Sequence, residues 1–194
     1  MSRYYIRRME LAELQSFFKR IQQDFSQGEY APYVVMYQQI QDNRQKALVF
    51  CEETQDLAYS VYTDSHDNGY VLISLLAVFS DYRGRGIGSA FLKTICEIYR
   101  HKQAILVEVE RPDQAQTQEE VNSRSKRIKF YKKLGFYFIE GIDYAIWDIP
   151  MHLMALPLLG SKIAIDQEIE RTMYEIYLSL MGKKLIYKMK LSKK

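Results

Sequence analysis

The sequence predicts an α/β (α+β) fold in which helices flank a mixed, mostly antiparallel central sheet. Three observations lead to this prediction. Short β-rich runs recur along the 194 residues, and two of them, 46–53 and 57–64, have the pattern of a hairpin. Segments with apolar residues at helical spacing separate several of these runs. The alternation of Leu106, Glu108 and Glu110 indicates a strand with one polar face, which tells against a sheet buried on both sides.

The first half of the chain carries clear element signals. Apolar residues three and four apart, from Leu11 to Ile21, predict a helix, and the Asn68–Gly69 dipeptide predicts a turn. In chain order we expect a strand at 4–9, a helix at 10–25, a break at 26–32, a short helix at about 33–42, the hairpin, a turn at 65–69 and a strand at 70–79.

The second half is predicted in the same way. Asn122 or Ser123 is expected to cap a helix that stops at Gly135, and Gly182 is expected to end a later helix. The expected elements are a helix at 88–102, a strand at 104–110, a polar loop at 111–120, a helix at 124–134, apolar runs at 136–139, 144–147 and 152–158, a helix at 163–181, and a tail that adds a strand or a partner contact.

Composition narrows the class of protein. The chain is 47% hydrophobic and 26% charged, as ordinary globular proteins are, and its net charge of +3 is too small to argue for nucleic-acid binding. The opening segment lacks an apolar signal core, and no apolar run approaches the ~20 residues that span a bilayer. We expect one cytoplasmic domain over 1–194, without a membrane or nucleic-acid partner. Cys51 and Cys96 fit no metal-ligand spacing, so we expect no metal and two buried, reduced thiols.

The stretch Arg83-Gly84-Arg85-Gly86-Ile87-Gly88 lies between an apolar strand and a helix. Glycines at a helix entrance let an anion approach the unpaired N–H groups of the first turn, and the two arginines add positive charge. The stretch lacks the Gly-Lys-Ser/Thr of a P-loop, and it has no glycine at the third position that the dinucleotide fingerprint requires. A plain strand-to-helix turn is the structural alternative, and a single-copy RNA-binding stretch is a distant one.

The spacing Arg83-x-x-Gly86-x-Gly88, after "LLAV" and before "GSAFL", resembles the coenzyme A signature of the GNAT superfamily of N-acetyltransferases. Two further segments, "VEV" (107–109) and "FYKKLGF" (130–136), resemble family segments and occur in the family order. The resemblance covers about residues 70–138. It implies the GNAT fold, with a sheet splayed between its central strands and here an extra C-terminal helix, and it implies acetyl-CoA as cosubstrate.

The resemblance also implies which residues bind the cofactor. Backbone N–H groups along the glycine-rich turn would cradle the pyrophosphate, the first turn of the helix would line it, and the strand before it would pair with pantetheine and polarise the thioester carbonyl. The implied residues are Leu76, Ala77, Val78, Arg83, Gly84, Arg85, Gly86, Ile87, Gly88, Ser89 and Ala90. Gly84 occupies a variable place in the motif.

Two residues are the candidates for proton transfer. Glu108 lies where certain family members place a general base, and Glu110 or a water molecule are the alternatives for that role. If Glu108 has no catalytic role, we expect it to face solvent or to form an ion pair with Arg124 or Arg127. Tyr131 aligns with the family tyrosine that protonates the departing thiolate. The alternative is that Tyr131 is simply a core residue. A phenol and a thiol have ordinary pKa values near 10 and 8.5, which are close enough for such a transfer.

The acceptor is not specified by the sequence. Asp24 and Glu29, in the variable acceptor-side segment, would pair with a cationic amine or belong to a capped loop, and we take Glu29 as the substrate-binding candidate. The resulting hypothesis is an enzyme that transfers acetyl from acetyl-CoA to a small-molecule or peptide primary amine by direct attack. The alternative is a non-catalytic acyl-CoA-binding regulatory module. A homodimer is expected from the frequency of homodimers in the superfamily.

Overall fold

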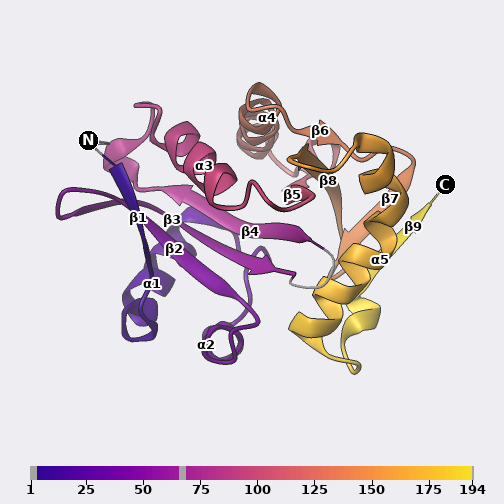
Figure 1. Cartoon of the computed structure of the whole chain (residues 1–194), viewed down its shortest axis with the longest axis horizontal. Coiled ribbons are helices and arrows are strands. Elements are labelled where there is room, and N and C mark those ends of the chain that lie inside the picture. The colour runs from indigo at the N-terminus through magenta and orange to yellow at the C-terminus, as the bar shows by residue number, and fades with distance from the viewer. Residues whose placement is uncertain (1–3, 66–68, 194) are drawn as a thin grey trace. The chain divides into compact units, whose positions relative to one another are not determined.

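The computed structural model describes residues 4–65 and 69–193, and these divide into two compact units (Figure 1). The first unit comprises Met1–Asp64 and Ile73–Tyr99, and the second comprises Ser65–Leu72 and Arg100–Lys194. No helix in the described ranges is long and apolar enough to cross a membrane.

The first unit is built on antiparallel strands. Strand β2 pairs with β1 on one side and with β3 on the other, and a register shift at Phe50/Cys51 interrupts the β2–β3 ladder. Its elements are β1 Tyr4–Arg8, the 3-10 turn η1 Leu11–Glu13, α1 Leu14–Asp24, α2 Tyr33–Gln41, β2 Lys46–Glu52, β3 Gln55–Asp64, the end of β4 Tyr70–Val78, the 3-10 turn η2 Ser80–Tyr82 and α3 Ile87–Ile98.

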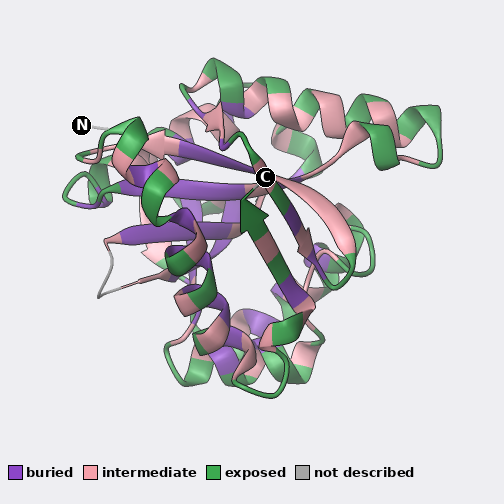
Figure 2. Ribbon diagram, turned by 90° about the vertical axis from the view of Figure 1, so that its right-hand side faces the viewer, coloured by how far each residue is buried: buried purple, intermediate pink, exposed green. Residues whose placement is uncertain are grey.

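Alternate residues of these strands serve two apolar layers. Val49 and Val61 lie in a buried cluster with Phe17 of α1, because successive side chains of a strand point to opposite faces. On the other face, Phe50 stacks on Phe91 of α3 with ring centroids 5.0 Å apart. Figure 2 shows long buried stretches (purple) in the strands, whereas the helices carry exposed residues (green). The start of α3, with the turn before it, is therefore anchored to the sheet.

The second unit is also antiparallel where its pairings are described. Strand β8 pairs with β5, β6 and β7, and β9 pairs with the other side of β7. Its elements are β5 Ala104–Glu110, the 3-10 turn η3 Pro112–Gln114, α4 Gln118–Lys133, β6 Tyr137–Phe138, β7 Ile142–Ile146, β8 Ile149–Pro157, α5 Lys162–Met181, the 3-10 turn η4 Ile186–Lys188 and β9 Met189–Lys193.

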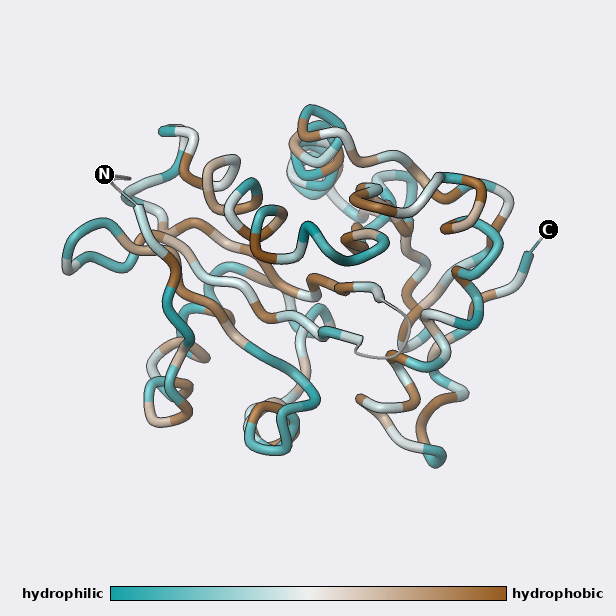
Figure 3. Tube along the Cα trace, in the orientation of Figure 1, coloured by the Kyte–Doolittle hydropathy of each residue, from teal (hydrophilic) through white to brown (hydrophobic). Residues whose placement is uncertain are grey.

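Helix α5 covers one face of this sheet with an apolar stripe. Ile169, Met173 and Ile176 recur at spacings of three and four, and they share a buried cluster with Leu106 of β5 and Leu153 of β8. Hydrophobic residues (brown in Figure 3) recur along the strands, while the β2–β3 turn is hydrophilic (teal). The face of β5 that carries Leu106 also carries Glu108, so α5 covers the strand on which the proposed base lies.

Most predicted elements are confirmed, and the differences have local causes. Helix α4 begins six residues earlier than predicted, because Thr117, and neither Asn122 nor Ser123, is its N-cap: the Thr117 hydroxyl accepts from the Glu120 N–H. The hairpin turn contains two residues, 53–54, because β3 begins at Gln55. The predicted turn at 65–69 lies largely at 66–68, outside the described residues.

The two glycines that were predicted to end helices are confirmed in that position. Gly135 has the left-handed φ expected after α4 (+96°), and Gly182 directly follows Met181, the last residue of α5. The tail adds a strand, β9, which pairs with β7.

Both cysteines are free, but only Cys51 is buried. The prediction that Cys96 is buried was wrong, since that side chain is partly exposed on α3.

Candidate active site

The glycine-rich turn makes two left-handed steps between β4 and α3. Gly84 and Gly86 have φ values of +77° and +79°, and a Cβ on either would meet no atom within 4 Å. These positions therefore need glycine for backbone conformation rather than for space, since other residues pay roughly 1–2 kcal/mol in this region. Gly84, the variable position of the motif, shares the left-handed φ of Gly86, whereas Gly88 lies inside the first turn of the helix.

The first turn of α3 presents its backbone N–H groups. Gly86 is the N-cap residue and, among the described residues, no side chain caps this end. The Ala90 N–H donates to the Gly86 carbonyl over 3.0 Å, so the N–H groups of Ile87, Gly88 and Ser89 precede the first bond of the helix. The hydroxyls of Thr117 and Ser161, by contrast, cap α4 and α5. The turn thus has the form of an anion site.

Arg83 uses its side chain within the first unit. Its Nε donates to the Val78 carbonyl at the end of β4 over 2.9 Å, and its Nη2 donates to the Asp24 carboxylate at the end of α1. Asp24 also accepts from the Tyr59 hydroxyl over 2.9 Å. The guanidinium therefore links the end of β4 to the end of α1, and its charge is balanced by Asp24. From the sequence we expect Asp24 to pair with a cationic amine or to belong to a capped loop; the structure instead pairs it with Arg83 and Tyr59.

The strand before the turn has alternating burial. Ala77 belongs to the buried cluster of the first unit, whereas Leu76 and Val78 on either side of it are half-buried. The Val78 carbonyl is held by Arg83. The predicted pantetheine-pairing segment is thus fixed at its end by the same arginine that opens the signature.

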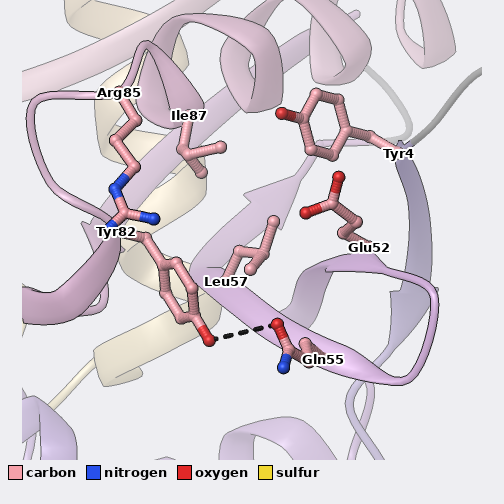
Figure 4. Close-up of a pocket in the computed structure, with 7 residues that line it drawn as sticks. All are labelled: Tyr4, Glu52, Gln55, Leu57, Tyr82, Arg85 and Ile87. Atoms are coloured by element: carbon pink, nitrogen blue, oxygen red, sulfur yellow. Dashed lines mark hydrogen bonds between the residues drawn. The ribbon is translucent and has the colours of Figure 1, made fainter.

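A pocket of about 420 Å³ adjoins the turn (Figure 4). Its wall includes Arg85 and Ile87 from the turn, and the Tyr82 hydroxyl donates to Gln55 Oε1 across it over 3.3 Å. The lining residues are Tyr4, Glu52, Gln55, Leu57, Tyr82, Arg85 and Ile87. Arg85 also lies over the Tyr82 ring, 5.7 Å from its centroid. Both signs of charge line this pocket.

In the second unit, Glu108 is held by two phenols. Its Oε1 accepts from the hydroxyls of Tyr144 on β7 and Tyr177 on α5, the latter over 2.7 Å, and its Oε2 lies 2.9 Å from the Tyr177 hydroxyl. Burial raises the pKa of Glu108, and the two tyrosine hydrogen bonds oppose that shift. Burial and the nearby carboxylate raise the pKa of both tyrosines well above 10, so they stay protonated donors.

Glu110, the alternative base, is engaged differently. Its Oε1 accepts from Arg124 Nη2 over 3.1 Å, and Arg124 Nη1 also donates to the Arg111 carbonyl. Arg124 thus ties α4 to the end of β5. The ion pair considered for Glu108 is formed by Glu110 instead. Glu108 is the carboxylate on this strand that is held by neutral donors.

Tyr131 lies near the end of α4 with 6% of its surface exposed. Its ring contacts those of Phe130 and Phe136, with centroids 5.1 and 5.2 Å away. Burial raises its pKa to about 12, and the Arg127 charge one helical turn away opposes this shift. Tyr131 is therefore a neutral O–H donor at physiological pH, and a weaker acid than a phenol in water.

Glu29 lies in the loop between α1 and α2, in the first unit. Its Oε2 accepts from the Ser26 N–H over 2.7 Å, which closes this loop. The loop-capping contact that the sequence allowed is therefore present at Glu29.

Comparison with known proteins identifies the family. The model of the acetyltransferase (GNAT) domain matches residues 43–137, which include the turn, β5 and Tyr131. The chain therefore contains a GNAT acetyltransferase domain. Its open, mostly antiparallel sheet flanked by helices is the GNAT fold, as predicted. No curated protein gives a significant sequence match to this GNAT chain.

Solved structures of GNAT proteins have the same fold. A protein from Bacteroides thetaiotaomicron assigned to the GNAT family superposes with a TM-score of 0.72 at 20% identity, covering 92% of this chain and 98% of that one. The ribosomal-protein-S18-alanine N-acetyltransferase of Escherichia coli gives 0.56 at 19% identity, covering 82% and 97%. A spermidine N-acetyltransferase from Vibrio cholerae, solved with CoA and spermine, gives 0.60 at 12% identity, covering 81% and 97%.

Sequence reasoning missed Tyr144 and Tyr177. Both lie beyond the matched segment, 36 and 69 residues from Glu108, so local spacing gives no sign of the contact. The sequence contains 16 tyrosines, but this count alone does not indicate which of them contact Glu108.

We predict that replacing Glu108 by Gln changes the pH dependence of stability. A carboxyl group whose pKa is raised above its ordinary value of 4.5 binds its proton more tightly in the folded state, so the wild type loses stability as pH rises from about 4.5 through the raised pKa. The amide carries no charge and avoids this loss. Glu108→Gln should therefore gain free energy of unfolding over the wild type as pH rises to neutral, measured by urea denaturation across pH 4–8.

The matched control is Glu140→Gln, which removes a carboxylate that lies exposed to water in the same unit. Its difference from the wild type should stay small over the same pH range. A Glu108→Gln difference that does not vary with pH would contradict the raised pKa of Glu108.

Proposed function

We propose that this GNAT protein transfers an acetyl group from acetyl-CoA to a primary amine by direct attack through a tetrahedral intermediate. The observation that carries the proposal is the turn before α3: two left-handed glycines lead into a helix whose first N–H groups are uncapped by any described side chain. Helix N-termini of this kind bind phosphate groups through backbone N–H donors. In this proposal the two units act as a single acetyltransferase domain over 1–194.

Acetyl-CoA is proposed to bind mainly through backbone groups. The pyrophosphate would accept from the N–H groups of the turn and of the first turn of α3, with Arg85 supplying positive charge, since Arg83 is engaged by Asp24. Pantetheine would pair with the backbone at 76–78, and one N–H there would polarise the thioester carbonyl. The residues proposed for the cofactor are Leu76, Ala77, Val78, Arg83, Gly84, Arg85, Gly86, Ile87, Gly88, Ser89 and Ala90.

The reaction requires a neutral amine. We propose that Glu108 accepts the amine proton, directly or through water, as the nitrogen attacks the thioester carbon. Burial raises the pKa of Glu108, which makes it a better proton acceptor than a fully solvated carboxylate. The carbonyl oxygen becomes negative in the intermediate, where a fixed N–H donor is worth roughly 3–4 kcal/mol.

Collapse of the intermediate breaks the C–S bond and releases the CoA thiolate. We propose that the Tyr131 hydroxyl donates to this sulfur. With its pKa raised to about 12, Tyr131 transfers its proton less readily than a solvated phenol. Tyr131 therefore first stabilises the developing thiolate by a hydrogen bond, and the proton is transferred to the sulfur afterwards.

A primary amine is the proposed acceptor class. The solved relatives include enzymes named for spermidine and for a ribosomal-protein alanine, which carry amines on a small molecule and on a protein. Glu29, on the loop between α1 and α2, is proposed to face the acceptor, with the Ser26 contact holding the loop in place. A homodimer is the proposed assembly, and a cytoplasmic location is proposed.

We predict that Gly86→Ala weakens acetyl-CoA binding at least tenfold, measured by isothermal titration calorimetry. Alanine disfavours φ = +79°, so the turn shifts and its N–H groups lose their common direction. The control is Gly141→Ala, at φ = +70° in the other unit and likewise without an atom within 4 Å of the added Cβ. Equal affinities for both variants and the wild type would contradict the assignment of the turn to the cofactor.

We predict that Tyr131→Phe lowers kcat about 100-fold while acetyl-CoA affinity changes little, because a general acid acts mainly after binding. Thiol release during turnover with an amine gives kcat, and calorimetry gives the affinity. Tyr137→Phe is the control: its hydroxyl donates to Asp166, on α5, over 2.9 Å, and that bond is outside the proposed chemistry. An unchanged kcat for Tyr131→Phe would remove Tyr131 from the mechanism.

A further inference from the structure

The environment of Glu108 depends on the chain beyond the family match. Helix α5 and strand β7 follow residue 137, and each places one buried tyrosine against this carboxylate. Tyr144 and Tyr177 are 5% and 7% exposed, while Glu108 on β5 is only half-buried. The two phenols therefore enclose the carboxylate on one side, and Glu108 as a whole residue keeps part of its surface exposed.

The two oxygens of Glu108 are not equivalent. Oε1 accepts from both hydroxyls, and the Tyr177 hydroxyl is closer to Oε1 (2.7 Å) than to Oε2 (2.9 Å). One hydroxyl has one proton, so Tyr177 divides a single donor between the two oxygens. Within the described residues Oε2 has this shared contact and no other hydrogen bond, which leaves it acceptor capacity.

We propose that Tyr144 and Tyr177 are positioning residues for acetyl transfer: their hydroxyls hold the Glu108 carboxylate by Oε1 and leave Oε2 to receive the proton of the attacking amine. This inference rests on the proposed role of Glu108 as base. The C-terminal helix α5 is then part of the working acetyltransferase, because it supplies one of the two donors.

The surroundings of Glu108 make the two phenols the groups that control its charge. On β8, its neighbour in the ladder is Leu153, which is apolar. On α5, the cluster around Tyr177 contributes Met173, Ile176 and Leu180, which are apolar as well. Glu110, the next acid on the same face of β5, is paired with Arg124 of α4. Among the described residues, the titratable groups that hydrogen-bond to Glu108 are thus Tyr144 and Tyr177.

Removal of one donor should make Glu108 harder to ionise. A hydrogen bond to the charged form favours that form, so Tyr177→Phe or Tyr144→Phe should raise the midpoint at which Glu108 loses its proton by about one pH unit. The double variant should show a larger rise. Phenylalanine keeps the ring and its packing, so each variant removes little besides the hydroxyl.

The test is a ¹³C NMR titration of protein labelled at the glutamate carboxyl carbon, with the Glu108 signal assigned by its loss in Glu108→Gln. The control is Tyr70→Phe, which removes a buried hydroxyl that donates to Glu168 of α5 over 2.8 Å, in the same apolar cluster. We expect Tyr177→Phe and Tyr144→Phe to raise the Glu108 midpoint and Tyr70→Phe to leave it unchanged. Midpoints equal to the wild type in both former variants would overturn the inference.

A second readout separates this inference from the proposed function. The acid limb of the pH–rate profile is measured by thiol release from acetyl-CoA, with whichever amine among spermidine, spermine, lysine and an alanine-ended peptide is acetylated. A limb that moves with the NMR midpoint supports both assignments. A midpoint that moves in the two tyrosine variants while the limb stays fixed overturns Glu108 as the base, although its hydrogen bonds are as proposed.

Discussion

The left-handed backbone at Gly84 and Gly86 is the constraint on which the first unit depends. After β4, η2 and Arg83, these two steps lead the chain into α3, which begins with its N–H groups uncapped by any described side chain. The consequences reach both ends of the turn. Arg83 is placed where its side chain can hold the Val78 carbonyl and the Asp24 carboxylate, and Ile87 starts the apolar stripe that packs α3 on the sheet. A residue with a Cβ at either glycine would strain the element that the cofactor is proposed to use.

In the second unit the corresponding constraint is a carboxylate in an apolar setting. A buried charge is unfavourable unless donors compensate for lost water, and here the donors are two phenols rather than a cation. An arginine beside Glu108, like Arg124 beside Glu110, would favour the charged form of the carboxylate. Phenols hold the carboxylate in position without supplying a full positive charge, so Glu108 remains able to exchange a proton. This difference between neighbouring acids is the physical basis for choosing Glu108 over Glu110.

Much of the fold could be predicted from the sequence because its signals are local. The apolar spacing of α1 and α5, the glycines after α4 and α5, and the glycine offsets before α3 each lie within a few residues of what they determine. The start of α4 was missed although its signal was local too: Thr117 and Glu120 have the spacing of a capping residue and its partner, but they lie in a polar stretch that resembles a loop. The second half of the Glu108 site could not be predicted. Its two phenols reach the carboxylate only because β7 joins the sheet and α5 covers it, and no pattern in one sequence gives that pairing.

The most direct test of the proposed function is amine-dependent release of CoA thiol. Purified protein is mixed with acetyl-CoA, with and without each of a panel of primary amines, and free thiol is followed over time while the acetylated product is identified by mass spectrometry. An acetyltransferase should release thiol and form the N-acetyl product in equal amounts with at least one amine. If calorimetry shows that acetyl-CoA binds but no amine in a broad panel increases thiol release, the chain is an acyl-CoA-binding module, and the roles proposed for Glu108 and Tyr131 are contradicted.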